Sequence, residues 1–461
     1  MISQRKRILG WYFFDWASQP YHTLLVTFVF GPFFALVAAD HFATQGLDDQ
    51  SADARAQALW SWTLAVAGLV IAFGAPLLGA LADTAGRRIP WIAGFSLMCA
   101  VGAAGLWWTD PNGSNLSVAL LFFAVGFIGV EFALIFVNSQ LPSLSPTQEA
   151  GAISGTGFAV GYLGGLVSLI IILVFFMTLG DGRTIAGLPP ALGLDPSQAE
   201  DQRIVGPFTA LWFVLFMVPY FLWVRDSDEI HQRGRMRDAL SSLATTVRRL
   251  PARQSLFAYL GGSMLYRDAL NGLYAFGGTY AVLVLDWTTT QVGIFGIVSV
   301  IAAGAFSWAG GRVDLARGPK PVIMTAICGL ILVCVIVVGM DRSQFYGISL
   351  APGSGLPDAV FFACGVFIGG LGGTLQAASR TLMLRHTDPS SPTASFALYG
   401  LSGRATAFLA PALIGLVTAW SGNARFGVAP LIILFVLGLL LLRFVQAEGD
   451  SPTWRDGGSV R

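Results

Sequence analysis

Residues 79–88 read Gly-Ala-Leu-Ala-Asp-Thr-Ala-Gly-Arg-Arg, and they join two apolar runs of about twenty residues each. The first run ends near residue 82 and the next begins at Ile89, so only a tight hairpin between two membrane helices fits between them. Gly86 is expected to supply the turn, and Arg87 and Arg88 are expected at the cytoplasmic surface. Asp83 cannot lie unpaired in lipid, so it should meet a basic side chain or a helix N-terminus.

The composition is that of an integral membrane protein. Hydrophobic residues make up 54% of the 461 residues and charged residues only 11%, whereas soluble domains contain about 25% charged residues. The net charge of +1 gives no basic face for nucleic acid. The four cysteines and four histidines show no metal-ligand spacing. No phosphate-binding Gly-xxxx-Gly-Lys-(Ser/Thr) loop and no nucleophile–base constellation is present, so we expect no metal, no cofactor and no enzymatic activity.

A weaker copy of the hairpin indicates that the chain has two related halves. Residues 310–320 read Gly-Gly-Arg-Val-Asp-Leu-Ala-Arg-Gly-Pro-Lys, with Asp314 in the place of Asp83 and Lys320 at the end. The apolar runs predict an all-α fold with twelve transmembrane helices, and the repeated hairpin predicts that they form two six-helix, pseudo-symmetric bundles. The spans are near 9–38, 58–82, 89–109, 116–139, 153–178, 207–224, 256–285, 290–311, 321–340, 357–384, 393–419 and 426–446.

These spans define the expected domains. Residues 1–224 form the N-terminal bundle, 225–255 a basic cytoplasmic linker, 256–446 the C-terminal bundle and 447–461 a cytoplasmic tail. Most Lys and Arg residues then fall on the side of both termini, which the positive-inside rule makes cytoplasmic. The exceptions in the outer loops are Arg55, Arg183, Arg203, Arg342 and Arg425. We therefore expect a protein of the bacterial cytoplasmic (inner) membrane.

Ionisable residues inside the spans are the first candidates for a functional site. They are Asp15, Glu131, Arg267, Asp268 and Arg380. Polar residues on the same helical faces, or beside a predicted kink at Pro20, extend this set by Gln19, Tyr21, Asn138, Asn271, Tyr274 and Gln376. An alternative is that the charged residues form ion pairs that only lock the bundles. His22 is either a proton carrier or a hydrogen-bonded structural histidine.

Residues around the two hairpins are candidates for gating or packing rather than for binding a solute. They are Gly79, Asp83, Gly86, Arg87, Arg88, Asp314, Lys320 and Arg404. Glycines also crowd the predicted fifth helix, at positions 151, 155, 157, 161, 164 and 165, and this spacing permits tight helix crossing.

The two hairpins resemble the loop signature of the major facilitator superfamily, in which helices 1, 4, 7 and 10 line a central cavity. Thr84 stands where that signature has its first basic residue. Asp15, Glu131, Arg267 and Arg380 fall on those four helices, so the resemblance implies that they converge on one cavity used in alternating access. It also implies that Asp83 lies against the start of helix 11 in one of the two access states.

Several longer stretches are similar to the "unknown major facilitator" family, whose fungal members are autophagy-related vacuolar amino-acid effluxers. They are residues 15–21, 153–165, 266–268 with 275–278, 373–380 and 402–411. Two positions depart from the family pattern close to the proposed site. Ser18-Gln19-Pro20 stands in place of Asn-Ser, and Asn138-Ser139-Gln140 in place of Asn-Ala-x.

These features predict a secondary active transporter that moves a small polar solute, such as an amino acid or a similar zwitterion or anion. Arg267 and Arg380 would bind a carboxylate, and Asp15 or Glu131 would hold an ammonium group or a coupling proton. The expected partners are this solute, the lipid bilayer and protons, with no nucleic acid, and the protein is expected to be a monomer. The alternatives are proton-coupled efflux of drugs or other metabolites and, from another class, a lipid scramblase or an intramembrane enzyme.

Overall fold

The computed structural model describes residues 2–85, 87–144, 149–178, 182–226, 248, 250–287, 289–388, 391–421 and 423–449. Gly86, nearly all of the predicted linker and the end of the predicted tail lie outside these ranges. The described chain is almost entirely helical. Its strands are β1 (Gln344–Phe345) and β2 (Ile348–Ser349), which form an antiparallel hairpin.

Within these ranges, ten helical segments are long and apolar enough to cross a membrane. The segments are Gln4–Thr44, Ala58–Asp83, Ile89–Trp108, Leu116–Asn138, Ala150–Phe175, Glu200–Trp223, Gln291–Arg317, Pro319–Val338, Leu356–His386 and Arg425–Leu442. The two other predicted spans correspond to α11 (Gln254–Leu283) and to a pair of shorter helices, α15 (Pro392–Ala405) and α16 (Leu409–Ser421). The prediction of a twelve-helix membrane fold is therefore confirmed.

The chain divides into two compact units. Unit 1 comprises residues 1–78, 82–138 and 160–233, and unit 2 comprises 79–81, 139–159 and 234–461. The helix α7 (Ala150–Phe175) contributes its first ten residues to unit 2 and the others to unit 1. The domain boundaries expected from the sequence stay a prediction.

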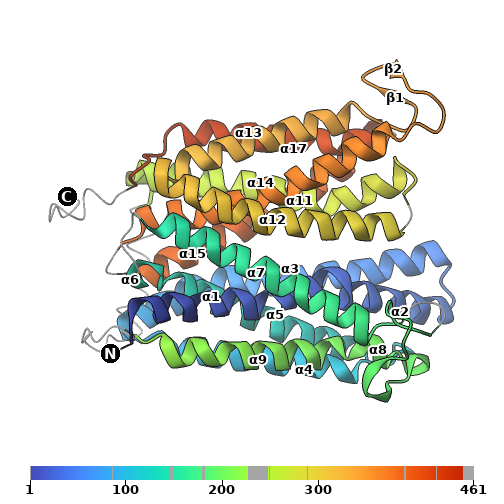
Figure 1. Cartoon of the computed structure of the whole chain (residues 1–461), viewed down its shortest axis with the longest axis horizontal. Helices are drawn as coiled ribbons and strands as arrows, with labels where there is room; N and C mark the ends of the chain where they lie inside the picture. The colour runs from blue at the N-terminus through green and yellow to red at the C-terminus, as the bar shows by residue number, and fades with distance from the viewer. Residues whose placement is uncertain are drawn as a thin grey trace. The chain divides into compact units, whose positions relative to one another are not determined.

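Unit 1 is a bundle in which α9 lies along both α1 and α4, and α4 packs closely on α5 (Figure 1). Its elements, besides α7, are α1 (Gln4–Pro20), η1 (Tyr21–Phe28), α2 (Phe30–Thr44), α3 (Asp49–Ala85), α4 (Ile89–Gly105), η2 (Leu106–Trp108), α5 (Leu116–Asn138), η3 (Ala191–Gly193), η4 (Pro196–Gln198), α8 (Glu200–Arg203) and α9 (Val205–Trp223).

The first membrane helix changes its winding after Pro20, where a kink was predicted. Residues Tyr21–Phe28 form a π-helix, and α2 starts only after Val29, whose backbone leaves the helical region. Because proline cannot donate the next backbone bond, this is where the regular α-helical ladder is weakest. The altered winding changes which side chains share a face beyond Pro20.

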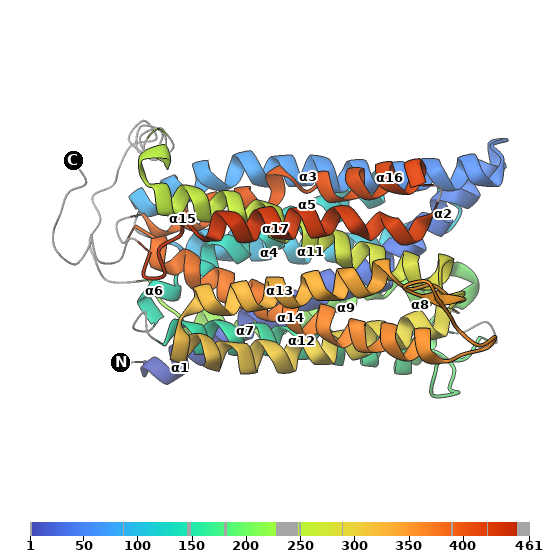
Figure 2. The same ribbon diagram turned by 90° about the horizontal axis from the view of Figure 1, so that it is seen from above.

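Unit 2 is a second bundle, in which α12 and α13 pack along α14, and α11 packs along α17 (Figure 2). Its elements, besides α11, α15, α16, the hairpin and the start of α7, are α6 (Leu141–Leu144), η5 (Leu250–Ala252), α12 (Thr289–Arg317), α13 (Pro319–Val338), α14 (Leu356–His386), η6 (Ala424–Val428) and α17 (Ala429–Leu442).

The predicted span 393–419 is broken into α15 and α16 by a turn at residues 406–408. Pro411 explains the position of the break, because its ring lacks an N–H and would clash with the carbonyl of residue 407 in a continuous helix. Within the first turn of a new helix the same proline is tolerated. The prediction of one continuous helix over residues 393–419 is therefore wrong.

Glycines bring the helix backbones together, as their spacing predicted. In unit 2, a Cβ atom on Gly155 would lie 2.4 Å from the carbonyl oxygen of Ser307. In unit 1, a Cβ on Gly164 would lie 2.6 Å from the carbonyl oxygen of Trp16. Real Cβ atoms do not approach so closely, so any larger residue at these positions would push two helices apart.

The start of α4 is held by an acidic residue from the segment that follows α9. Asp226 accepts hydrogen bonds from the backbone N–H groups of Arg88, at 3.0 Å, and Ile89, at 3.1 Å. A carboxylate at this position satisfies otherwise unbonded donors and interacts favourably with the helix dipole.

We therefore predict that Asp226→Ala lowers the free energy of unfolding by about 1 kcal/mol. The thermal unfolding midpoint of the purified protein in detergent measures this change. Asp226→Asn is the matched control, because its side-chain oxygen can still accept a bond, and it should unfold closer to the wild type. Equal midpoints for the alanine variant and the wild type would contradict this role of Asp226.

Candidate functional site

Unit 1 places an acid beside a histidine within its membrane helices. The Oε1 atom of Glu131, on α5, lies 4.0 Å from Nε2 of His22, on η1. The Glu131 side chain is only 13% exposed and that of His22 is 32% exposed. When His22 is protonated, the two groups form an ion pair, and when it is neutral the pair carries one negative charge. The pair is therefore suited to holding a proton or a cation.

Asp15 and Gln19 lie one turn apart on α1, on the side that packs against α7. A Cβ on Gly161 would lie 3.4 Å from the Cβ of Asp15, and one on Gly165 would lie 2.9 Å from Cγ of Gln19. Both polar side chains are half-buried. The glycines of α7 thus leave space for two polar side chains between the helices of unit 1.

Tyr21 and Asn138 have different surroundings. Tyr21 is fully buried, and its hydroxyl donates to the carbonyl of Phe123 at 2.8 Å. It also packs directly on Gly126. These contacts describe an anchor between η1 and α5 rather than a group facing a solute. Asn138, the last residue of α5, is half-buried.

In unit 2, Arg380 of α14 is only 2% exposed and is bonded to the start of α7. Its Nε donates to Oγ of Ser154 at 2.9 Å, and its Nη2 donates to the Ser154 carbonyl at 2.8 Å. The guanidinium lies 4.4 Å from the ring centre of Phe158. Ser154 in turn donates to the carbonyl of Ala377 at 2.8 Å. These contacts favour the alternative that Arg380 locks its bundle.

Arg267 of α11 is half-buried and lies over an aromatic ring. Its guanidinium carbon is 4.4 Å from the ring centre of Tyr399, and Nη1 donates to the Tyr399 carbonyl at 3.1 Å. Gly403 leaves the space that the guanidinium occupies. Further along α11, Asn271 and Tyr274 are exposed, and Gln376 of α14 is half-buried.

Asp268, next to Arg267, faces the broken helix. It is 1% exposed, and its Oδ2 accepts a hydrogen bond from the backbone N–H of Ala410 at 2.9 Å. Ala410 belongs to the first turn of α16. The sequence placed Asp268 in a solute cavity, whereas the structure places its carboxyl at the start of a helix inside the same unit.

The hairpin residues lie in two kinds of environment. Asp83 is buried and forms an ion pair with Arg88, with 3.3 Å between Oδ1 and Nη2. Arg87 is exposed. Gly79 lies close to the backbone of Thr393, since a Cβ there would be 3.0 Å from the Thr393 carbonyl oxygen. The expected pairing of Asp83 with a basic side chain is confirmed.

In the second hairpin, Asp314 is 2% exposed and its carboxyl lies directly against Gly151. Among the residues that the structure describes, no hydrogen bond to either of its carboxyl oxygens is formed within the distance and angle limits of an ordinary hydrogen bond. Lys320 donates to the carbonyl of Val445 at 2.7 Å and so fixes the end of α17. Gly86 and the side chain of Arg404 lie outside the described residues.

The candidate site residues therefore divide between the units. Asp15, Glu131 and their polar neighbours belong to unit 1, and Arg267, Asp268 and Arg380 belong to unit 2. Their convergence on one cavity stays a prediction. Among the residues that the structure describes, no group of three or more His, Cys, Asp or Glu side chains is suited to a metal ion.

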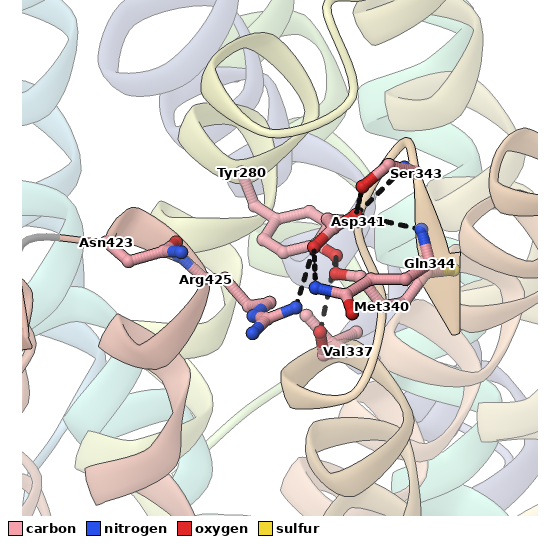
Figure 3. A network of polar contacts seen from close by, with 8 residues as sticks. All are labelled: Tyr280, Val337, Met340, Asp341, Ser343, Gln344, Asn423 and Arg425. Carbon is pink, nitrogen blue, oxygen red and sulfur yellow. Dashed lines mark hydrogen bonds and ion pairs between the residues drawn. The ribbon is translucent and has the colours of Figure 1, made fainter. Parts of the chain in front are cut away.

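The sequence analysis missed a polar network between the loops of unit 2 (Figure 3). Asp341, after α13, accepts from Nη1 of Arg425 at 2.7 Å, from Nε2 of Gln344 at 2.9 Å and from the N–H of Ser343 at 2.8 Å. Tyr280 of α11 donates to the Met340 carbonyl at 2.6 Å. The network joins α11, α13 and η6. Acid and base lie far apart in sequence, so only the fold reveals the pairing.

A buried histidine was also missed. Nδ1 of His386 lies 2.9 Å from the carbonyl of Leu382, so Nδ1 carries a hydrogen, and Nε2 lies within hydrogen-bond distance of Oγ of Ser255, at 2.7 Å. Ser255 also accepts the N–H of Gln446 at 2.9 Å. The end of α14, the start of α11 and the segment after α17 are thereby joined.

The fold identifies the class of protein. The structure matches the proton:xylose symporter XylE with a TM-score of 0.69, at 13% identity, over 98% of both chains. It matches the human organic anion transporter MFSD10 with a TM-score of 0.69, at 14% identity, over 96% of this chain and all of that one. The protein thus has the fold of the major facilitator superfamily.

The sequence then defines the family. A profile described as "Vacuole effluxer Atg22 like" matches residues 3–451, and the chain belongs to this family. It is 23% identical over 449 residues to the MFS-type transporter YxiO of Bacillus subtilis, covering 96% of this chain and 95% of YxiO. It is 26% identical to autophagy-related protein 22-2 of Sclerotinia sclerotiorum, covering 65% of this chain but only 45% of that protein. The family resemblance noted in the sequence is confirmed.

The Asp341 network gives a pH-dependent prediction. Partial burial acts to raise the pKa of Asp341, but hydrogen bonds from Gln344 and Ser343 outweigh it and hold the pKa below its ordinary value. A carboxyl whose pKa is lower in the folded state stabilises that state above its unfolded pKa of about 4. This stabilisation is lost as the pH falls through the lower, folded-state pKa.

Asp341→Asn should therefore lower the free energy of unfolding at neutral pH by about 1–3 kcal/mol, because Arg425 loses its charged partner. Thermal unfolding midpoints measured from neutral to acidic pH should converge for variant and wild type at the acidic end. Asp195→Asn, in an exposed loop, is the control and should have little effect. A difference between Asp341→Asn and wild type that stays constant with pH would contradict this account.

Proposed function

We propose that the protein is a secondary transporter of the cytoplasmic membrane for a small zwitterionic or anionic solute, with amino acids as the first class to test. The observation that carries the proposal is the acid–histidine pair of Glu131 and His22 within the membrane helices of unit 1. Charge at this depth is costly, and in transporters it marks the path of a substrate or a proton. The choice of amino acids rests on the sequence resemblance to a family whose fungal members are vacuolar amino-acid effluxers.

Arg267 is the better of the two arginines for a solute carboxylate. It is half-buried and donates a hydrogen bond to the Tyr399 carbonyl, with its guanidinium over the face of the Tyr399 ring. Arg380 is almost fully buried, and two of its N–H groups donate hydrogen bonds to Ser154. A carboxylate bound by Arg267 would accept a bidentate, charge-assisted pair of hydrogen bonds.

Ligand-induced stabilisation tests the choice of solute. Purified protein is screened by thermal shift against amino acids, sugars and cationic dyes, since a ligand that binds only the folded state raises the midpoint. We expect amino acids to raise it and sugars not to. Stabilisation by dyes alone would support drug efflux instead and contradict the proposal. Arg267→Lys is the matched variant, which keeps the charge but loses bidentate geometry and should weaken the shift.

Glu131→Gln tests the role of the acid. If Glu131 carries the coupling proton, the variant should lose uptake driven by a pH gradient in vesicles but retain exchange of labelled solute across the membrane. The loss should be at least about tenfold, in the range of an essential proton-transfer group. Unchanged gradient-driven uptake would remove Glu131 from proton coupling.

A further inference from the structure

The start of α16 poses a specific problem, because this helix begins inside a predicted membrane span. A helix that starts there exposes backbone N–H groups where water is scarce. The N–H of Leu409 is bonded to the carbonyl of Thr406 at 2.8 Å, and Pro411 has no N–H. Ala410 is left with a donor that needs an acceptor from another element.

Asp268 supplies that acceptor from α11. Its Oδ2 receives the Ala410 N–H at 2.9 Å. Gly272 lies one turn further along α11, and a Cβ there would be 2.7 Å from the Cβ of Ala410. The same face of α11 therefore presents a carboxyl and a glycine to the first turn of α16, and the two helices meet closely at this point.

The second carboxyl oxygen of Asp268 has no partner among the described residues. Oδ1 is fully buried and receives no hydrogen bond from them, and no described basic side chain forms an ion pair with Asp268. Arg267 is directed to Tyr399 instead. A buried carboxylate with one hydrogen bond and no counter-ion is costly, and the addition of a proton removes the charge.

We propose that Asp268 is a proton-binding site whose occupancy sets how firmly α16 is held on α11. When ionised, Asp268 accepts a charge-assisted hydrogen bond from Ala410 and favours the N-terminus of α16. When a hydronium ion from the solvent transfers a proton to Oδ1, one of its O–H bonds breaks, a new O–H bond forms on Oδ1, a water molecule is released and the negative charge of the carboxylate disappears. The bond to Ala410 then becomes an ordinary neutral one. This site is distinct from Glu131 and does not depend on which solute is transported.

Few neighbouring groups titrate. The helices α16 and α17 contain no titratable side chain, nor does η5. The helix α15 carries Tyr399 and Arg404, and the Arg404 side chain lies outside the described residues. Three other elements packed against α11 carry charged side chains, and none of these side chains bonds to Asp268 in the structure. They are Arg425 of η6, Arg312, Asp314 and Arg317 of α12, and Asp358, Arg380, Arg385 and His386 of α14.

Infrared difference spectroscopy of the full-length protein tests the proton site directly. Protein labelled with ¹³C-carboxyl aspartate and reconstituted in vesicles is titrated between about pH 4 and about pH 9, which spans ordinary and buried carboxyls. We expect the carbonyl band of a protonated aspartic acid in wild type, and its loss in Asp268→Asn. Asparagine keeps an acceptor for Ala410, so the helix start is preserved.

The control is Asp314→Asn, which alters another buried carboxyl of unit 2 and should retain the Asp268 band. If no aspartate band titrates in wild type, or if the same band persists in Asp268→Asn, the proposal is wrong. A band that changes with sodium concentration at fixed pH would also overturn it, because the site would then bind a metal cation. None of these outcomes depends on the thermal-shift screen, so failure of the proposed solute class is recognised separately.

Hydrogen exchange tests the coupling to α16. After correction for intrinsic exchange rates, protection of the amides of Leu409, Ala410, Ala412 and Leu413 should rise about twofold to thirtyfold in wild type as Asp268 ionises, the range for a charge at a helix terminus. In Asp268→Asn the corrected protection should not change with pH. An equal rise in both proteins would show that Asp268 does not hold α16.

Discussion

The constraint on which the structure depends is the absence of water in the interior of a membrane. Every backbone or side-chain polar group there must find a partner inside the protein. The start of α16 uses Asp268 for this purpose, and the buried Tyr21 uses the carbonyl of Phe123. Both irregular segments, the π-helix and the broken helix, lie at prolines, and both are joined to a neighbouring helix by a polar side chain.

Glycine is the counterpart of these polar partners. A polar side chain can bridge two helices only when their backbones are close, and a glycine allows this close approach because it has no Cβ. Gly272 lies opposite Ala410, and Gly161 and Gly165 lie beside Asp15 and Gln19. The glycine spacing in the sequence therefore marks helix contacts. It also marks the places where membrane-buried polar groups can be tolerated. Only the helix contacts were predicted from the sequence.

The spans and the family could be predicted because they depend on local information, namely the length of apolar runs and short motifs. Pairings could not, since they join residues far apart in the chain. The contact of Arg380 with Ser154 and that of Asp341 with Arg425 have no sequence signal. The contact of His22 with Glu131 could not be predicted either, because the π-helix after Pro20 changes the regular α-helical spacing that fixes which side chains share a face.

Burial alone therefore does not separate functional from structural charge in this protein. Arg380 and Asp268 are equally inaccessible, but the hydrogen bonds from Arg380 to Ser154 require no change of charge. Asp268 has one oxygen bonded to Ala410 and one that no described residue bonds, so its environment suits both protonation states in turn. A charged group whose partners fit only one protonation state has a structural role, because a change of that state would lower the stability of the fold. A group whose partners leave room for two states can respond to its surroundings, and in a transporter such a group is where an ion gradient can act on the fold.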